Sequence, residues 1–347
     1  MRGLVFHAPG DVRVETVAQP VLRGPNEAIV RVTATAVCGS DLHVYRGRET
    51  GLDAGTVLGH EFVGVVEETS PGTGLAPGQR VVAPFTTSCG DCFYCRRGLT
   101  ARCERGELFG WVERGAGLHG AQAERVRVPL AASTLVGLPD EVPDGRALLA
   151  ADVLATGSFA ADLGGVEAGS TVAVLGCGPV GLMAVAACRR RGAARILAVD
   201  RLPERLALAH RFGGEPVDFE RFEPAAVILE ATAGRGVDAV LEVVGTPEAT
   251  RLAVDLVRPG GVVAAVGVHT EHRFAFAPGE AYDKNLTYRA GRCPARHYLE
   301  PLLAELAASP ADLDAVWTHR LPLTAAAEAY ALFDARRDGC VKVLLTP

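Results

Sequence analysis

The chain has 347 residues, of which 48% are hydrophobic, and its mean hydropathy is +0.18, so it can form two domains with cores of their own and is not expected to be disordered. Its formal net charge of −6 and the lack of a face dense in lysine and arginine exclude a nucleic-acid partner. The first residues, MRGLVFHAPGDVRVET, hold no apolar segment of signal-peptide length, so we expect a cytoplasmic protein whose nine cysteines serve metal binding or catalysis rather than disulfides.

Residues 1 to about 150 are rich in short β segments separated by proline and glycine turns. Two of these segments are EAIVRVTATAV at 27–37 and EFVGVVEE at 61–68, and their spacing predicts a small, partly open barrel. Cys38 follows the first segment, and His60 precedes the second. A thiolate and an imidazole at strand ends are typical of half a zinc site, although a histidine by itself is more often structural.

Four cysteines follow in one loop with the spacing C-x2-C-x2-C-x7-C. Four sulfurs complete a tetrahedral shell with no open position, so this pattern predicts a structural zinc in a lobe at about 85–110. An iron–sulfur cluster is the alternative, because two-residue spacings also hold such clusters. The four residues are Cys89, Cys92, Cys95 and Cys103.

The alanine- and leucine-rich stretch 147–163 predicts one helix. Within it, Asp152 lies between Ala151 and Val153. A carboxylate in so apolar a stretch is costly to bury unless it is paired or binds a metal. An exposed helix position is the other interpretation.

Residues 170–200 have the pattern of a dinucleotide-binding unit. A buried strand is predicted at 171–175, a helix at 179–191 and a second strand at 196–199. The turn after the first strand reads G-x-G-x-x-G, which lets backbone N–H groups at a helix N-terminus approach a pyrophosphate. The assigned residues of this turn are Gly176, Gly178, Pro179, Val180 and Gly181.

Asp200 ends the second strand, where a carboxylate accepts hydrogen bonds from the adenosine ribose hydroxyls. Its charge would repel a 2′-phosphate, so we expect NAD, although Arg201 and Arg205 leave NADP open. The uncharged run 168–188 has the length of a membrane span, but its glycines and Pro179 interrupt a spanning helix, so no membrane segment is expected.

Alternating helices and strands continue to about residue 268 and predict a doubly wound parallel sheet. The residues from about 280 onward contain too few elements for a separate core, so we expect them to complete the first domain. The expected helices are 203–212, 224–233 and 247–257, and the expected strands are 237–244 and 261–268.

These features together resemble the zinc-dependent medium-chain alcohol dehydrogenases over essentially the whole chain. Two further segments, GLHGAQAERVRVPLA at 117–131 and AGRCPARHY at 290–298, resemble most closely the glutathione-independent formaldehyde dehydrogenase branch and its shorter bacterial relatives. The main resemblance is carried by CGSDLH at 38–43, GHE at 59–61 with Gly64, the four-cysteine loop, DVLATG at 152–157, the glycine motif with Asp200, and Lys342.

The resemblance implies a GroES-like barrel as catalytic domain, at 1–150 and 286–347, and a Rossmann NAD-binding domain at 151–285. It also implies one catalytic zinc in addition to the structural one. The catalytic zinc would polarise an alcohol, which is oxidised reversibly to an aldehyde or ketone as hydride passes to NAD. Its implied ligands are Cys38, His60 and Asp152.

The resemblance further assigns roles around the metal and the cofactor. Glu61 is the acid that approaches the metal during ligand exchange. Ser40 passes the alcohol proton through the cofactor ribose to His43, for which an ordinary surface histidine is the alternative. The implied cofactor contacts are Thr156 at the nicotinamide, Val266 and Val268 at its carboxamide, Lys342 at the pyrophosphate, and Arg205 across the adenosine.

The implied partner is a small alcohol or aldehyde, and the habit of the family implies a homotetramer, with a homodimer as the alternative. Formaldehyde dehydrogenase-like or polyol dehydrogenase activity stays open, as does a zinc-free quinone reductase. A catalytically silent NAD-binding sensor is the alternative from a different functional class.

Overall fold

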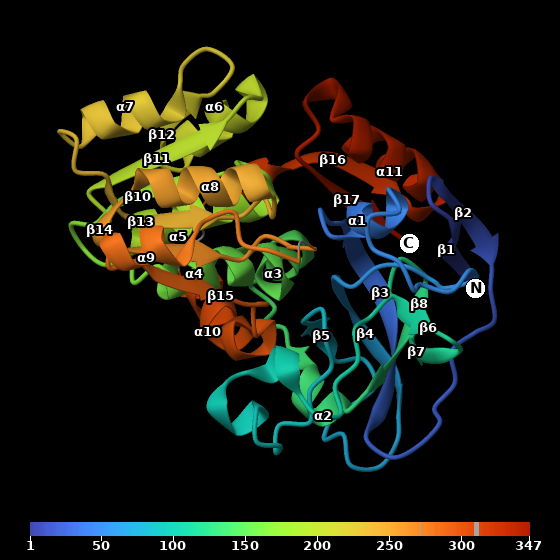
Figure 1. Cartoon of the computed structure of the whole chain (residues 1–347). Helices are drawn as coiled ribbons and strands as arrows, with labels where there is room; N and C mark the ends of the chain where they lie inside the picture. Colours follow the sequence, from blue (N-terminus) through green and yellow to red (C-terminus); the bar gives the residue numbers. More distant parts are fainter. Residues whose placement is uncertain (271, 309–311) are drawn as a thin grey trace. The chain divides into compact units, whose positions relative to one another are not determined.

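The computed structural model describes residues 1–270, 272–308 and 312–347. The chain forms two compact units, the first made of Met1–Ala155 with Pro294–Pro347 and the second of Thr156–Cys293. We expected the domain boundaries at 150/151 and 285/286, and the boundaries between the two units lie at 155/156 and 293/294. The second unit is thus inserted into the chain of the first (Figure 1).

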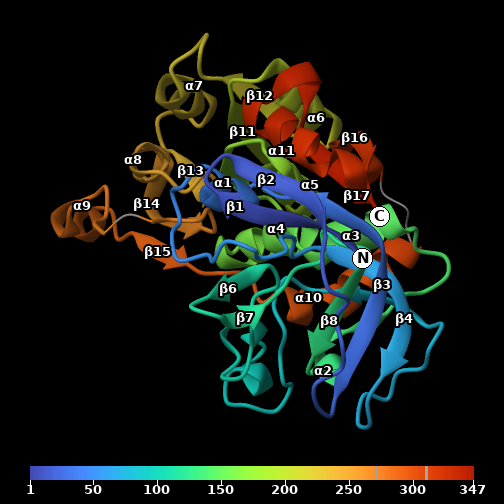
Figure 2. The same ribbon diagram turned by 90° about the vertical axis from the view of Figure 1, so that its right-hand side faces the viewer.

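The first unit is built on a mostly antiparallel seven-stranded sheet. Its order is β16-β17-β3-β4-β5-β9, and β8 also pairs with β3. Figure 2 shows β3, β4 and β8 side by side as long arrows. The strands are β3 (Glu27–Val37), β4 (Phe62–Thr69), β5 (Arg80–Ala83), β8 (Arg125–Pro129), β9 (Val136–Gly137), β16 (Trp317–Pro322) and β17 (Lys342–Thr346).

The β3–β4 pairing requires a glycine in β4. Val32 lies opposite Gly64 in this pair, and a Cβ added at Gly64 would lie 2.3 Å from the carbonyl oxygen of Arg31. A side chain there would push the strands apart. Alternating residues of the sheet face a core in which the rings of Phe62 and Phe109 meet edge to face at 5.1 Å.

Short hairpins and helices complete the first unit. Helix α11 covers the β1–β2 hairpin with a second buried cluster that includes Leu4, Phe6 and Tyr330. The elements are β1 (Arg2–Ala8), β2 (Asp11–Thr16), β6 (Trp111–Glu113), β7 (Ala116–Leu118), α1 (Asp41–Tyr45), α2 (Ala131–Thr134), α3 (Asp144–Ala151), α10 (Ala295–Ala308) and α11 (Ala326–Ala335), with 3-10 turns η1 (Cys95–Arg97), η2 (Thr100–Arg102), η3 (Leu313–Val316), η4 (Leu323–Ala325) and η5 (Arg337–Gly339).

The prediction of one helix over 147–163 is wrong. Helix α3 ends at Ala151, and α4 (Val153–Leu163) starts after a break at Asp152, whose φ of −143° and ψ of −77° are not helical. The break turns the Asp152 side chain towards the buried side chains of Cys38 and His60.

The second unit is a six-stranded sheet of order β12-β11-β10-β13-β14-β15, and every pair is parallel. This is the doubly wound order, in which the chain crosses from β12 to β13 and the two halves of the sheet meet between β10 and β13. The strands are β10 (Thr171–Leu175), β11 (Arg195–Asp200), β12 (Glu215–Asp218), β13 (Val237–Glu242), β14 (Val257–Ala265) and β15 (Thr287–Ala290).

Helices flank this sheet, as Figure 1 shows for α5 and α8. The five helices α5 to α9 begin with proline in the first turn, where its missing N–H costs no hydrogen bond. Among the described residues, no helix combines the length and the apolar character needed to cross a membrane. The helices are α5 (Pro179–Arg190), α6 (Pro203–Arg211), α7 (Pro224–Ala231), α8 (Pro247–Leu256) and α9 (Pro278–Asp283).

Candidate active site and four-cysteine lobe

Four potential metal ligands of the first unit converge. One ligand atom from each of Cys38, His60, Glu61 and Asp152 lies within 4.8 Å of the others. The Asp152 Oδ2 atom is 3.1 Å from Cys38 Sγ and 3.6 Å from His60 Nε2. Cys38 follows β3, His60 and Glu61 precede β4, and Asp152 fills the break between α3 and α4, so paired strands and a helix break bring the four together.

Burial and charge strongly affect ionisation in this cluster. Burial and the neighbouring Asp152 carboxylate raise the pKa of Cys38 to about 12. Burial also raises the pKa of Glu61, to about 7, although Lys342 opposes this change. Burial alone would lower the pKa of His60, but the carboxylates of Asp41 and Asp152 outweigh it and raise that pKa well above its ordinary value. These shifts favour a neutral thiol at Cys38 and a protonated ring at His60.

Asp41 orients the ring of His60. Its Oδ1 atom is 3.1 Å from His60 Nδ1, and its Oδ2 atom accepts the backbone N–H of Cys38 at 2.9 Å. With Nδ1 bonded to a carboxylate, Nε2 is left to face Cys38 and Asp152. Asp41 was assigned no role from the sequence, although its place three residues after Cys38 in CGSDLH was the available signal.

Lys342 lies beside the metal cluster. Its Nζ atom is 2.9 Å from Glu61 Oε1, and neither side chain is exposed. Burial lowers the pKa of Lys342, but Glu61 and the other anions raise it above its ordinary value, so the ammonium stays charged. The predicted contact of Lys342 with a pyrophosphate stays a prediction.

Ser40 and His43 lie close to the cluster in sequence, but only Ser40 contacts it. The Ser40 Oγ atom is 3.3 Å from His60 Nε2. His43 is half-buried on α1, and its Nδ1 atom is buried without a hydrogen-bond partner among the described residues. Burial lowers the pKa of His43, so the ring is neutral at pH 7 and can accept a proton.

The cluster fits a zinc ion. A thiolate, an imidazole and a carboxylate form a borderline-soft donor set that zinc accepts in catalytic sites with an open position. Glu61 Oε2 is buried without a hydrogen-bond partner in the described part of the chain. Such an oxygen is costly to bury unless a cation comes close to it.

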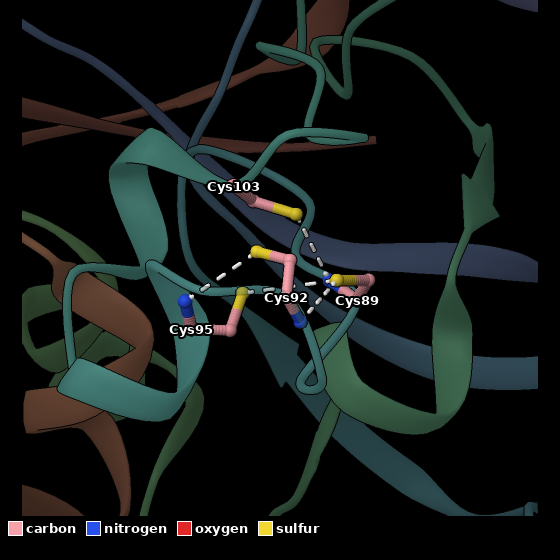
Figure 3. A group of neighbouring side chains, drawn as sticks. All are labelled: Cys89, Cys92, Cys95 and Cys103. Atoms are coloured by element: carbon pink, nitrogen blue, oxygen red, sulfur yellow. Dashed lines mark hydrogen bonds between the residues drawn. The ribbon is translucent and has the colours of Figure 1, made fainter.

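The four-cysteine lobe forms a second candidate metal site. The ligand atoms of Cys89, Cys92, Cys95 and Cys103 lie within 4.8 Å of one another, and Figure 3 shows the sulfurs gathered at its centre. Backbone N–H groups donate to three of them, as Cys89 does to Cys103 at 3.2 Å and Cys92 does to Cys89 at 3.4 Å. Donors to sulfur stabilise thiolates, and four thiolates fit a closed zinc shell.

The glycine motif of the second unit forms the turn from β10 to α5. Gly176 has a φ of 89°, a conformation that favours glycine. A Cβ added at Gly181 would lie 1.8 Å from the carbonyl oxygen of Gly176, so helix and turn pack too closely for any side chain. Gly178 caps α5, and Pro179 occupies the first turn with Val180.

Asp200 lies at the end of β11, beside this turn. Its Oδ2 atom accepts the N–H of Cys177 at 2.8 Å, and its Oδ1 atom accepts those of Arg201 and Leu202 at 2.7 and 3.0 Å. The Arg205 guanidinium is 3.8 Å from the carboxylate, whereas that of Arg201 points to Glu220 at 3.3 Å. The carboxylate is therefore held in place by the backbone, with one arginine nearby.

The remaining predicted cofactor residues also lie in the second unit. Thr156 is on α4, and Val266 and Val268 follow β14. A further pair in this unit was not expected from the sequence. Glu242 Oε2 lies 2.8 Å from His269 Nε2, and Glu242 Oε1 accepts the N–H of Gly245 at 2.7 Å. Glu242 ends β13, so its position at the carboxyl edge of a parallel strand was the available signal.

Comparison with known proteins identifies the family. Residues 24–140 match the model of the alcohol dehydrogenase GroES-like domain, and residues 179–308 match that of the zinc-binding dehydrogenases. A zinc-type alcohol dehydrogenase B from Aspergillus flavus is 42% identical over 97% of this chain and 79% of its own length. The chain belongs to the zinc-binding alcohol dehydrogenase family.

The structural comparison agrees with this assignment. The solved alcohol dehydrogenase TADH from Thermus sp. ATN1 superimposes with a TM-score of 0.94 at 42% identity, over 100% of this chain and 99% of its own. The predicted GroES-like and Rossmann architecture, zinc dependence and alcohol oxidoreductase activity are thus confirmed as properties of the family, and NAD use fits it.

The relation to formaldehyde dehydrogenases is more distant than expected. A glutathione-independent formaldehyde dehydrogenase from Pseudomonas aeruginosa is 33% identical over 96% of this chain and 95% of its own length. The Aspergillus and Thermus proteins, at 42% identity, are both more similar.

Proposed function

We propose that the chain reversibly oxidises an alcohol to an aldehyde or ketone, with NAD as the hydride acceptor and Cys38, His60 and Asp152 as the ligands of a catalytic zinc. The observation that carries this proposal is the convergence of one sulfur, one imidazole nitrogen and two carboxylates within 4.8 Å. In this proposal the first unit is the catalytic domain, and the second is the NAD-binding domain.

Zinc would supply a Lewis acid that makes the alcohol proton easier to remove. The chain itself holds the ligands and moves the proton. Asp41 keeps His60 Nε2 turned to the cluster, and Lys342 balances the Glu61 charge. Ser40 is the proposed first acceptor of the alcohol proton, and His43, neutral and half-buried, is the proposed group that passes it to solvent.

The second unit supplies the proposed cofactor contacts. N–H groups of the β10–α5 turn would bind the pyrophosphate, and Asp200 would bind the adenosine ribose. Because Asp200 is already anchored by three backbone N–H groups, its charge cannot swing away from a 2′-phosphate, which supports NAD over NADP. The residues of the second unit proposed to contact the cofactor are Thr156, Gly176, Gly178, Pro179, Val180, Gly181, Asp200, Arg201, Arg205, Val266 and Val268. Lys342 of the first unit is a further proposed contact.

A second copy is the proposed partner at the edge of the NAD-binding sheet. Strand β15 is an edge strand, and near it the side chains of Phe274 and Tyr282 are 67% and 87% exposed. Unpaired strand edges beside exposed aromatic side chains favour association. We propose a homotetramer that includes this edge contact, in the cytoplasm, where the thiols of Cys38 and of the lobe stay reduced. Sedimentation measures the oligomeric state.

Replacing Asp152 tests the function directly. The Asp152→Ala variant should keep the zinc of the lobe and lose the catalytic one, so the metal content falls from about two ions per chain to about one. NADH formation from a panel of alcohols should fall about a hundredfold or more, because a Lewis acid contributes several kcal/mol to such reactions.

The matched control is Asp140→Ala, whose side chain is 97% exposed and which should retain both ions and full turnover. Full activity of Asp152→Ala would contradict the assigned metal site. A wild-type chain that binds NAD and two zinc ions yet turns over no alcohol or aldehyde would instead support the sensor.

A further inference from the structure

A series of buried, hydrogen-bonded side chains continues from the metal cluster into the interior of the first unit. Its first member is Asp41, whose carboxylate contacts His60 on one oxygen and the backbone of Cys38 on the other. The Asp41 side chain is 7% exposed. Any movement of this carboxylate therefore displaces two of the proposed ligands together.

Gln122 lies directly behind Asp41 and is fully buried. Its Nε2 atom donates to the carbonyl oxygen of Ala36 at 2.9 Å and lies 3.5 Å from Asp41 Oδ2. Its Oε1 atom accepts the hydroxyl of Tyr330 at 2.9 Å. Because donors and acceptors alternate along these contacts, the orientation of the amide is fixed.

Tyr330, on α11, is the last member of this hydrogen-bonded series and is also fully buried. Burial raises the pKa of Tyr330 well above its ordinary value, so the hydroxyl keeps the proton that it donates to Gln122. Removing that hydroxyl would leave a buried amide oxygen without a partner, and the amide would be free to turn away from Asp41.

Gln122 also packs against the segment that carries His60. Gly59 has a φ of 96°, and a Cβ added there would lie 2.5 Å from both the Cγ atom and the backbone nitrogen of Gln122. Gln122 therefore contacts the residue before His60 as well as the carboxylate that orients the His60 ring.

We propose that Gln122 and Tyr330 are positioning residues of the metal centre, which hold Asp41 and, through it, His60 and Cys38 in the orientation that binds zinc. This inference rests on the proposed assignment of Cys38, His60 and Asp152 as ligands. Groups beyond the ligands fix the tautomer and direction of a metal-bound histidine, and a buried network in which every member is satisfied is rigid.

The test is zinc retention by the full-length holoenzyme of Tyr330→Phe. This change keeps the ring, which packs in the α11 core, and removes the hydroxyl alone. Competition with a coloured chelator should show the dissociation constant of the catalytic zinc rising about tenfold, the lower limit for loss of a partner beyond the ligands. The zinc of the four-cysteine lobe should be retained as in the wild type. The Asp152→Ala variant, which keeps only the lobe zinc, identifies the two release phases.

Two further variants sharpen the test. Tyr45→Phe is the matched control, because the Tyr45 ring meets that of Tyr330 edge to face at 5.5 Å. The Tyr45 hydroxyl does not belong to the hydrogen-bonded series, so this variant should release zinc as the wild type does. Gln122→Glu still offers an acceptor to Tyr330 but no amide hydrogens to Ala36 or Asp41. It should lose the catalytic zinc at least as readily as Tyr330→Phe.

Unchanged release of the catalytic zinc from both Tyr330→Phe and Gln122→Glu would overturn the inference. Equal weakening of both zinc sites with a lower melting temperature would overturn it too, because the hydroxyl would then merely stabilise the fold. If Asp152→Ala binds as much zinc as the wild type, the proposed ligand set itself fails. That result is distinct from a failure of the positioning role alone.

Discussion

Charge balance at the metal cluster depends on single residues. With Cys38 as thiolate, the cluster holds three anionic side chains, those of Cys38, Glu61 and Asp152. A divalent zinc and the Lys342 ammonium together supply three positive charges. At the proposed zinc site, the buried Lys342–Glu61 pair would therefore balance the charge of the second carboxylate beside the ligands. Breaking such a pair typically costs about 3–5 kcal/mol.

The sequence predicted some of these contacts and not others. Cys38 and His60 stood out because they adjoin strand ends, and Asp152 because its surroundings are apolar. The pairing of Glu61 with Lys342 joins residues 281 positions apart, and no local pattern reports such a contact. Asp41 was overlooked, although it lies within CGSDLH, because a carboxylate in a polar segment is usually exposed to solvent.

We predict that His43 makes the stability of the fold fall at acidic pH. Burial lowers the pKa of His43 in the folded chain below its ordinary 6.5, so between these values the unfolded state binds more protons. This contribution to stability is complete above about pH 6.5 and is lost as the pH falls through the folded-state pKa. Urea unfolding of the wild type and of His43→Gln at pH 5 and pH 7.5 measures it.

The difference in unfolding free energy between the two pH values should be smaller in His43→Gln than in the wild type. The exposed His272 provides the control, since His272→Gln should keep the wild-type difference. An unaltered pH dependence in His43→Gln would mean that the His43 ring titrates in the same way in both states.

At the scale of elements, helix periodicity predicted the Rossmann helices well but failed at the α3–α4 break. Alanine and leucine favour a continuous helix through residues 147–163, and local propensity contains no term for a carboxylate that belongs in a metal cluster. Tertiary contacts of Asp152 with Cys38 and His60 outweigh that propensity. The break is therefore a consequence of the site, and it was not visible in the pattern.

The β10–α5 turn leads to a sharp prediction. In Gly181→Ala, the new methyl group would lie 1.8 Å from the carbonyl oxygen of Gly176, so α5 must move away from the turn that we propose to bind the pyrophosphate. We expect the dissociation constant of NAD to rise at least tenfold, equivalent to about 1.4 kcal/mol. Titration calorimetry with NAD measures this change.

Gly279→Ala is the comparison variant, because a Cβ at Gly279 would meet nothing within 4 Å. Its affinity for NAD should equal that of the wild type. Tight NAD binding by a folded Gly181→Ala protein would show that the turn does not hold the cofactor.

At the scale of the whole molecule, the two units differ in continuity. The parallel sheet of the second unit is built from one uninterrupted segment, Thr156–Cys293, whereas the first unit needs both ends of the chain. Strand β17 lies between β16 and β3, and Lys342 on β17 pairs with Glu61. The sequence could suggest this return because the last elements are too few for a core, but not that β17 would enter the sheet beside β3.

We therefore predict that residues 156–293 fold and bind NAD as a separate fragment, whereas residues 1–155 do not form a stable fold. The 156–293 fragment keeps the buried cluster of its own sheet intact. The 1–155 fragment lacks β17, which pairs with β3, and Lys342, which pairs with Glu61. Circular dichroism melting and NAD titration distinguish them. A disordered 156–293 fragment, or a cooperatively melting 1–155 fragment, would be the opposite of this expectation.

The long separation between Glu61 and Lys342 has a consequence for synthesis on the ribosome. At about 5–20 residues per second, the 281 positions between them take roughly 15–55 s to translate. Throughout that interval the Glu61 carboxyl group has no ammonium partner, because Lys342 has not yet been added to the nascent chain. The proposed ligands are thus synthesised well before strand β17, and the cluster gains its buried counter-charge only after β17 has been made.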